Sequence, residues 1–138
     1  MKKKFVNEQF NREEIKKRGF RRFLNSWKFS IQGLTYAYKY EQSMLIHFVA
    51  TISAVILGML LRISAMEWLL IFLSLGVVLA MELINTAIEA VVDMVTLEIH
   101  PLAKIAKDCG SAATFVVSIL TAVVSLAIYV PRFIELVK

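Results

Sequence analysis

Three long apolar stretches constrain what this chain can fold into. Residues 44–61 and 111–130 contain no Asp, Glu, Lys or Arg, whereas residues 68–95 begin uncharged and become punctuated by polar side chains. A helix needs about 20 apolar residues to cross a bilayer, and an isolated strand cannot satisfy its backbone hydrogen bonds in lipid. We therefore expect an all-α membrane protein with spans at about 44–61, 68–95 and 111–130.

The composition agrees with a membrane protein of one domain. The 138 residues are 58% hydrophobic, with a mean hydropathy of +0.65, against about 45–50% apolar residues in soluble domains. A soluble domain this small could not bury so much apolar surface. With no repeat or second domain in sight, residues 1–138 are expected to form one integral-membrane domain. Its single cysteine, Cys109, excludes an internal disulfide and matches no metal-ligand spacing.

The segment before the first span has the pattern of an amphipathic helix. Its apolar residues recur three and four positions apart between Arg and Lys: Phe20, Phe23, Leu24, Trp27, Ile31, Leu34 and Tyr38. We expect this part of residues 1–40 to lie along the membrane interface as a surface helix.

Basic residues are concentrated on one side of the expected membrane. Ten of the 16 Lys and Arg precede residue 30, which beside membrane spans indicates a cytoplasmic flank facing anionic lipid rather than a nucleic-acid partner. With the N-terminus inside, 13 basic residues face the cytoplasm and three, Arg62, Arg132 and Lys138, face outside. The second span then ends at the cytoplasmic surface, near Asp93.

The second span carries a stripe of carboxylates that a purely structural helix would not tolerate. At about 100° per residue, Glu89 and Asp93 lie roughly 20° to either side of Glu82, and Asn85 lies roughly 60° away. An acidic side chain at the centre of a span costs roughly 2.5–3.5 kcal/mol, and crowded carboxylates repel one another. A divalent cation would relieve both penalties, since hard ions prefer oxygen ligands. The alternative is a stripe packed against a basic helix bearing Arg21 and Arg22.

Other candidates lie at the same expected depth. Glu41 precedes the first span, although alone it would be an ordinary helix-end charge. Lys107 is a candidate phosphate ligand, although such a lysine is usually an anchor at the membrane boundary. His47 has the pattern of a packing or interfacial group. The chain has no glycine-rich phosphate loop and no His-Glu-x-x-His motif, so scattered carboxylates and cations would have to hold any nucleotide.

Two motifs resemble the prokaryotic diacylglycerol kinase and undecaprenol kinase family from about Gly19 to Pro131. They are Glu82-x-x-Asn85-x-Ala87-Ile88-Glu89-x-x-x-Asp93 and Ala106-Lys107-Asp108, with Glu41 before the first span. The resemblance implies a homotrimer of chains with a surface helix and three spans. It also implies transfer of the γ-phosphate of magnesium ATP to the hydroxyl of a membrane lipid, at sites between subunits on the cytoplasmic side of the cell membrane.

The resemblance implies a role for each matching residue. Glu82 would be the general base, Glu41 and Glu89 the Mg²⁺ ligands, and Asn85 would orient groups around them. The nucleotide-binding residues would be Arg22, Phe29, Glu41, Glu89, Glu98, His100, Lys107 and Asp108. The lipid-binding residues would be Arg22, Ser30, Glu82, Asn85 and Ser111.

The resemblance leaves the lipid open. Glu67-Trp68 and His100-Pro101-Leu102-Ala103-Lys104 resemble the undecaprenol kinases, whereas Gly110-Ser111-Ala112-Ala113 is closer to the diacylglycerol kinases. We expect undecaprenol, with diacylglycerol as the alternative. Two other classes remain: a proton- or cation-conducting subunit, which a stripe confined to half of one span disfavours, and a non-catalytic assembly factor.

Overall fold

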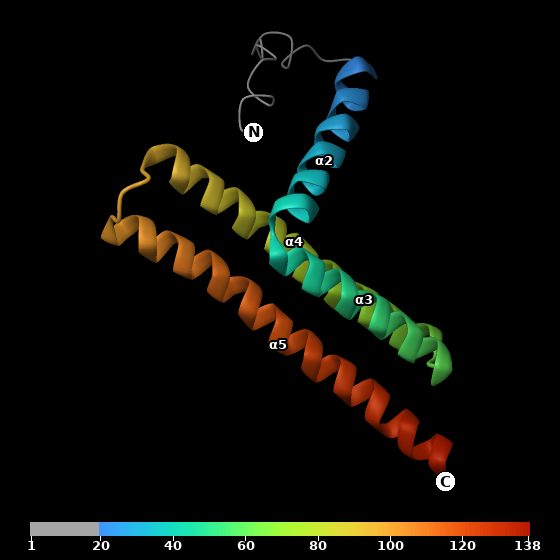
Figure 1. The fold of residues 1–138 in the computed structure, drawn as a ribbon. Helices are drawn as coiled ribbons and strands as arrows, with labels where there is room; N and C mark the ends of the chain where they lie inside the picture. The colour runs from blue at the N-terminus through green and yellow to red at the C-terminus, as the bar shows by residue number, and fades with distance from the viewer. Residues whose placement is uncertain (1–19) are drawn as a thin grey trace. The chain divides into compact units, whose positions relative to one another are not determined.

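The computed structural model describes residues 20–138, so the basic flank before them lies outside the described part of the chain. The described elements are α2 (Phe20–Tyr40), α3 (Gln42–Leu60), α4 (Ala65–Val95) and α5 (Pro101–Val137) (Figure 1). The chain divides into two compact units, Met1–Tyr36 and Ala37–Lys138. The second unit contains all of α3, α4 and α5.

Three helices are long and apolar enough to cross a membrane, as expected. They are α3, α4 and α5, and their most apolar windows are only 11%, 22% and 17% buried within the chain. The all-α architecture with three spans is therefore confirmed. Most of the apolar surface of these helices remains for lipid or for other protein chains to cover.

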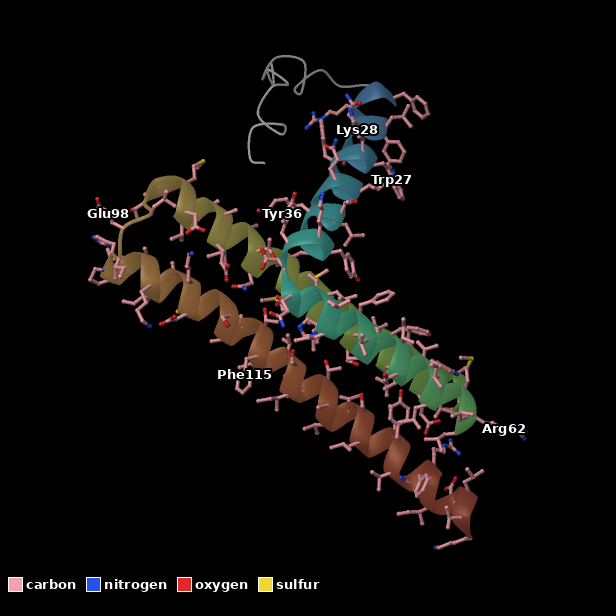
Figure 2. The ribbon with its side chains drawn as sticks, in the orientation of Figure 1. Trp27, Lys28, Tyr36, Arg62, Glu98 and Phe115 are labelled. Atoms are coloured by element: carbon pink, nitrogen blue, oxygen red, sulfur yellow. The ribbon has the colours of Figure 1, made fainter. Side chains whose placement is uncertain are left out.

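The expected amphipathic helix is present as α2. Its large apolar side chains are exposed, as at Phe23, Leu24, Trp27 and Ile31, and Trp27 and Lys28 are labelled in Figure 2. The helix ends at Tyr40, and extended backbone at Glu41 then leads into α3. Its position along a membrane surface stays a prediction.

Within the second unit, α4 packs along α5 and also contacts α3. Its buried apolar core lies toward the turn between α3 and α4 and comprises Leu61, Ile63, Ile71, Ile128 and Tyr129. The Tyr129 hydroxyl donates a 2.9 Å hydrogen bond to the Ala54 carbonyl oxygen, which joins α5 to α3. Arg62, in that turn, and Glu98, between α4 and α5, lie at opposite ends of this unit (Figure 2).

Local chemistry explains where α4 and α5 begin. Ser64 and Glu67 form a reciprocal capping box at the start of α4. Pro101 occupies the first turn of α5, where a missing backbone N–H costs nothing, and His100 Nδ1 accepts from the Leu102 N–H.

The third expected span, at about 111–130, lies within a longer helix. This helix, α5, begins at Pro101 and continues through Pro131 to Val137. Arg132, one residue after this proline, binds the Glu67 carboxylate through Nε at 3.1 Å and Nη2 at 2.9 Å. That contact ties the last turns of α5 to α4.

Candidate functional site

A cavity of about 400 Å³ gathers the polar residues of three helices in the second unit. The start of α3, the carboxylate-bearing half of α4 and the early part of α5 contribute to it. Its lining residues are Glu41, Ser43, Ile46, His47, Glu82, Asn85, Glu89, Ser111, Thr114, Phe115 and Ser118. We call this space the carboxylate cavity.

Glu82 is the most deeply buried carboxylate of this cavity. The residue is only 5% exposed. The Ser43 hydroxyl donates to Oε1, and His47 Nε2 lies 4.0 Å from Oε2. Burial of a carboxylate is costly unless polar partners compensate it, and the Ser43 hydroxyl on α3 supplies a hydrogen bond.

Asn85 and Glu89 form the next part of the same face. Asn85 Nδ2 donates to Glu89 Oε1 at 3.3 Å. Asn85 Oδ1 is buried without a hydrogen-bond partner, and it lies where a side chain at Gly110 would begin. Glycine at this position of α5 therefore lets the backbone approach the amide of Asn85, whose oxygen remains able to accept from a bound group.

Glu41, the residue just before α3, lines the same cavity. Burial, followed by the negative charges of Glu89 and Glu82, raises the pKa of the Glu41 carboxyl above its usual range. The cavity thus concentrates negative charge that only protons or a cation can offset.

The donor set fits a hard divalent cation. Glu41 and Glu89 offer carboxylate oxygens, and Asn85 adds an unpartnered amide oxygen. Among residues 20–138, no three His, Cys, Asp or Glu side chains converge closely enough to hold a metal ion by themselves. Mg²⁺ usually takes only one or two carboxylates and completes its coordination with water and substrate phosphate oxygens, which this arrangement allows.

A second cavity, of about 310 Å³, collects four of the eight predicted nucleotide ligands. It lies at the connection between α4 and α5. Its lining includes Glu98, His100, Lys104, Lys107 and Asp108, together with Asp93. Lys107 Nζ lies 2.6 Å from Asp93 Oδ1, and Lys104 forms an ion pair with Asp108. We call this space the connection cavity.

The structure thus divides the predicted site residues into three groups. Glu41, Glu82, Asn85, Glu89 and Ser111 meet in the carboxylate cavity, whereas Glu98, His100, Lys107 and Asp108 line the connection cavity. The remaining three, Arg22, Phe29 and Ser30, belong to the first unit, where the Ser30 hydroxyl donates 2.9 Å to the Ser26 carbonyl oxygen. Their contacts with nucleotide or lipid stay predictions.

Four polar residues of the carboxylate cavity were not singled out as site residues from the sequence. They are Ser43, His47, Thr114 and Ser118, and the hydroxyls of the last two are buried without a partner. One signal was present: Ser43 and His47 are four residues apart and so share a helix face. Their common partner, Glu82, comes from another helix, which spacing within one helix cannot reveal.

Known proteins are similar to this chain over most of its length. The family described as prokaryotic diacylglycerol kinase matches residues 28–129. An undecaprenol kinase of Bacillus subtilis is 36% identical over 80% of this chain and 90% of its own length. Diacylglycerol kinases of Pseudomonas aeruginosa and Escherichia coli K12 are 40% and 36% identical, over 71% and 80% of this chain and 80% and 89% of their own. The chain therefore belongs to the prokaryotic diacylglycerol kinase family of membrane lipid kinases.

Proposed function

We propose that this protein transfers the γ-phosphate of magnesium ATP to the hydroxyl of a membrane lipid alcohol, with undecaprenol as the first candidate. The observation that carries the proposal is the carboxylate cavity, where Glu41, Glu82, Asn85 and Glu89 converge from two helices. Phosphoryl transfer needs little covalent help from a protein, and catalysis rests on positioning and charge stabilisation. A conducting subunit would need polar groups along a whole span, whereas Glu82 and Glu89 lie in the C-terminal half of α4.

Glu82 is the proposed general base. Its carboxylate is buried and held by Ser43 on the α3 side of the cavity, so its orientation is restricted before substrate binds. It accepts the proton of the lipid hydroxyl while the oxygen attacks the γ-phosphorus. Positioned proton transfer of this kind typically contributes about 10²–10⁴-fold to a rate.

Glu41 and Glu89 are the proposed Mg²⁺ ligands, and Asn85 orients Glu89 through its amide. The bound ion would supply neutralisation of phosphate charge. Lys107, Asp108, Glu98 and His100 in the connection cavity are the proposed nucleotide contacts. Lys107 would release the Asp93 carboxylate and bind a phosphate instead. Carboxylate and phosphate groups both form charge-assisted hydrogen bonds with lysine.

The site is proposed to face the cytoplasm. The helix α4 has 31 residues, or about 46 Å at 1.5 Å per residue, against a hydrocarbon core of about 30 Å. One end of α4 can therefore reach the headgroup region, and the positive-inside asymmetry of the sequence assigns its carboxylate end to the cytoplasm. ATP from water and a lipid hydroxyl can meet only at such an interface.

The proposed assembly is a homotrimer with sites shared between chains. One chain leaves three polar groups of the carboxylate cavity buried without partners, at Asn85, Thr114 and Ser118. It also leaves most of its apolar helix surface uncovered by protein. Neighbouring copies would enclose substrates that a single chain cannot.

The test of the proposal is a side-by-side assay of lipid acceptors. Purified protein in micelles would receive ATP labelled at the γ-phosphate and either undecaprenol or diacylglycerol, and products would be separated by thin-layer chromatography. We expect labelled undecaprenyl phosphate as the main product. Labelled phosphatidic acid alone would support the diacylglycerol alternative, which relatives of 36–40% identity favour. No labelled lipid from either acceptor would contradict lipid kinase activity toward both.

A further inference from the structure

His47 is the basic group closest to the proposed base. Among the side chains that the structure describes, it is the only basic one within 4.0 Å of a Glu82 oxygen. The His47 side chain is 19% exposed and that of Glu82 is 6% exposed. The two groups therefore face each other in a largely desolvated space, where electrostatic interactions are strong.

Two residues of α3 approach the two oxygens of Glu82 separately. The Ser43 hydroxyl donates to Oε1, whereas His47 Nε2 faces Oε2. A hydroxyl that already donates to Oε1 holds the carboxylate in place. The imidazole, in contrast, can either accept or donate a proton, depending on its protonation state.

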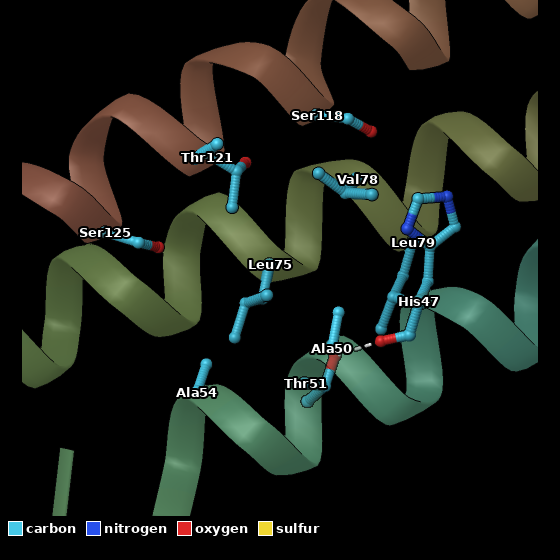
Figure 3. A pocket seen from close by; sticks show the side chains of 11 residues that line it. His47, Ala50, Thr51, Ala54, Leu75, Val78, Leu79, Ser118, Thr121 and Ser125 are labelled. Carbon is cyan, nitrogen blue, oxygen red and sulfur yellow. Dashed lines mark hydrogen bonds between the residues drawn. The ribbon is translucent and has the colours of Figure 1, made fainter. Parts of the chain in front are cut away.

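His47 also lies where two cavities adjoin. It lines the carboxylate cavity and a second space of about 200 Å³ between α3, α4 and α5, which is lined mainly by small, hydroxyl and aliphatic side chains. Figure 3 shows the imidazole reaching from α3 into this space, with Ser118 of α5 and Leu79 of α4 around it. The imidazole is thus next to Glu82 and also borders a space that neither Glu41 nor Glu89 lines.

We propose that His47 takes up the proton collected by Glu82 and so acts on the reaction through Glu82, as a positioning residue. This proposal rests on the proposed function of Glu82 as base. The lipid O–H bond breaks and its proton passes to Glu82. The lipid oxygen bonds to the γ-phosphorus, and the β–γ bridging bond breaks with its electron pair on ADP. The proton then moves from the Glu82 carboxyl to His47 Nε2 and from there to water, which returns both groups to their starting states.

The surroundings of the pair set the expected effect of pH. Glu41 at the start of α3 and Glu89 on α4 are the other charged groups of the cavity, and the α5 residues that line it, Ser111, Thr114, Phe115 and Ser118, carry no ionisable side chain. A protonated imidazole cannot accept a proton, so turnover should fall in acid.

The test compares the conservative variant His47→Gln with wild type and with Thr51→Val. Thr51 lies one turn along α3 and lines only the space shown in Figure 3, so it is the matched control. Each protein would be assayed for phosphorylation of the lipid that wild type accepts, between pH 5.5 and 8.5. His47→Ala would be assayed with and without added imidazole.

We expect His47→Gln to lower kcat about tenfold or more, with the KM for ATP and for lipid changed less than about threefold. Its kcat should also lose the dependence on pH between 6 and 8. Added imidazole should restore turnover to His47→Ala, and Thr51→Val should stay within about twofold of wild type. A His47→Gln variant with wild-type kcat and pH profile would overturn the proposal, as would one affected only in KM.

Other outcomes separate this proposal from the assignment of Glu82. Near-normal turnover of Glu82→Gln would reject the proposed base itself, whereas an inactive Glu82→Gln beside a wild-type-like His47→Gln would reject only the role of His47. If both His47 variants fail to fold, the wild-type profile decides. A rise of kcat from pH 6 to 8 supports the proposal, and a flat profile contradicts it.

Discussion

Three carboxylates share one cavity, and the negative charges of Glu89 and Glu82 make ionisation of Glu41 more costly. The effect is visible at Glu41, whose pKa is raised first by burial and then by the negative charges of Glu89 and Glu82. A carboxyl with a raised pKa favours its protonated form, so in the absence of a cation the folded protein loses stability as the pH rises through that pKa. A bound cation reverses this preference, because it stabilises the ionised form.

Magnesium activation should therefore depend on pH. As the pH falls, protons compete with Mg²⁺ for Glu41, so we expect the Mg²⁺ concentration for half-maximal activity to be higher at pH 6 than at pH 7.5. Glu41→Gln and Glu89→Gln should each raise this concentration about tenfold or more at pH 7.5. Glu41→Gln should also weaken its pH dependence. Steady-state Mg²⁺ titrations at both pH values measure all three effects.

Asp93→Asn is the comparison for these variants. Asp93 lies on α4, as Glu89 does, but it lines the connection cavity, where it pairs with Lys107. We expect its Mg²⁺ requirement to rise less than that of Glu89→Gln. Equal Mg²⁺ titrations for wild type and Glu89→Gln would remove Glu89 as a metal ligand.

At the scale of residues, sequence reasoning worked where one helix carries the information. Glu82, Asn85 and Glu89 follow one another at helical spacing, and the structure places them in one cavity. The sequence around His47 predicts a packing or interfacial group. It does not predict the partner, Glu82, because that residue lies on another helix. Its 4.0 Å approach to Glu82 depends on how α3 and α4 are packed, which no local pattern specifies.

At the scale of elements, the close approach of α5 to α4 depends on Gly110. A Cβ added there would collide with Asn85 Oδ1, which would displace the amide that donates to Glu89. We expect Gly110→Ala to lower kcat about tenfold or more. Gly76→Ala on α4 is the matched control, because a Cβ added there meets nothing within 4 Å. The lipid phosphorylation assay compares the two, and equal activity would contradict the tight α4–α5 contact.

The other end of the same helix pair should affect stability and leave chemistry unchanged. Arg132 binds Glu67 through two hydrogen bonds, and its side chain is 34% exposed. Arg132→Gln should lower the unfolding temperature, since the two charge-assisted hydrogen bonds to Glu67 would be lost. Thermal unfolding in detergent measures the loss, and kcat at 25 °C should stay within about twofold. A large fall in kcat with unchanged stability would contradict this purely structural role.

The sequence predicts the middle of α5 but neither of its ends. An uncharged run predicts the part of a helix that lies in lipid, but α5 extends beyond it at both ends. At its start, Pro101 and the His100 cap favour a helix although Lys104, Lys107 and Asp108 are charged. Its last turns make the Arg132–Glu67 contact, which is tertiary and so is not visible in a local sequence pattern.

In the proposed oligomer, the residues of one site can come from two chains. Glu82 and Lys107 line different cavities of one chain, so a site that uses both can draw them from neighbouring chains. We expect Glu82→Gln and Lys107→Ala proteins, each inactive alone, to recover a fraction of wild-type activity when they are refolded together. Mixed boundaries would then contain one site without either lesion.

Tags on the two proteins would verify mixing. The Glu82→Gln and Glu41→Gln pair should be tested in the same way, since those two residues come from different helices of the carboxylate cavity. Failure of every verified mixture to regain activity would favour a site built from one chain. If only the mixture of Glu82→Gln and Lys107→Ala proteins regains activity, the Glu41 and Glu82 of one site come from the same chain.

The most direct test of the central claim is a single-turnover measurement on Glu82→Gln. Enzyme in excess over γ-labelled magnesium ATP would be mixed with lipid acceptor and quenched at short times, with nucleotide affinity measured in parallel. Glu135→Gln is the matched control, because its carboxylate is exposed and pairs with Arg132 at the far end of α5. We expect Glu82→Gln to bind nucleotide within about twofold of wild type but to transfer phosphate at least about 100-fold more slowly, and Glu135→Gln to match wild type. Transfer by Glu82→Gln at a near-normal rate would contradict phosphoryl transfer through Glu82 in the carboxylate cavity.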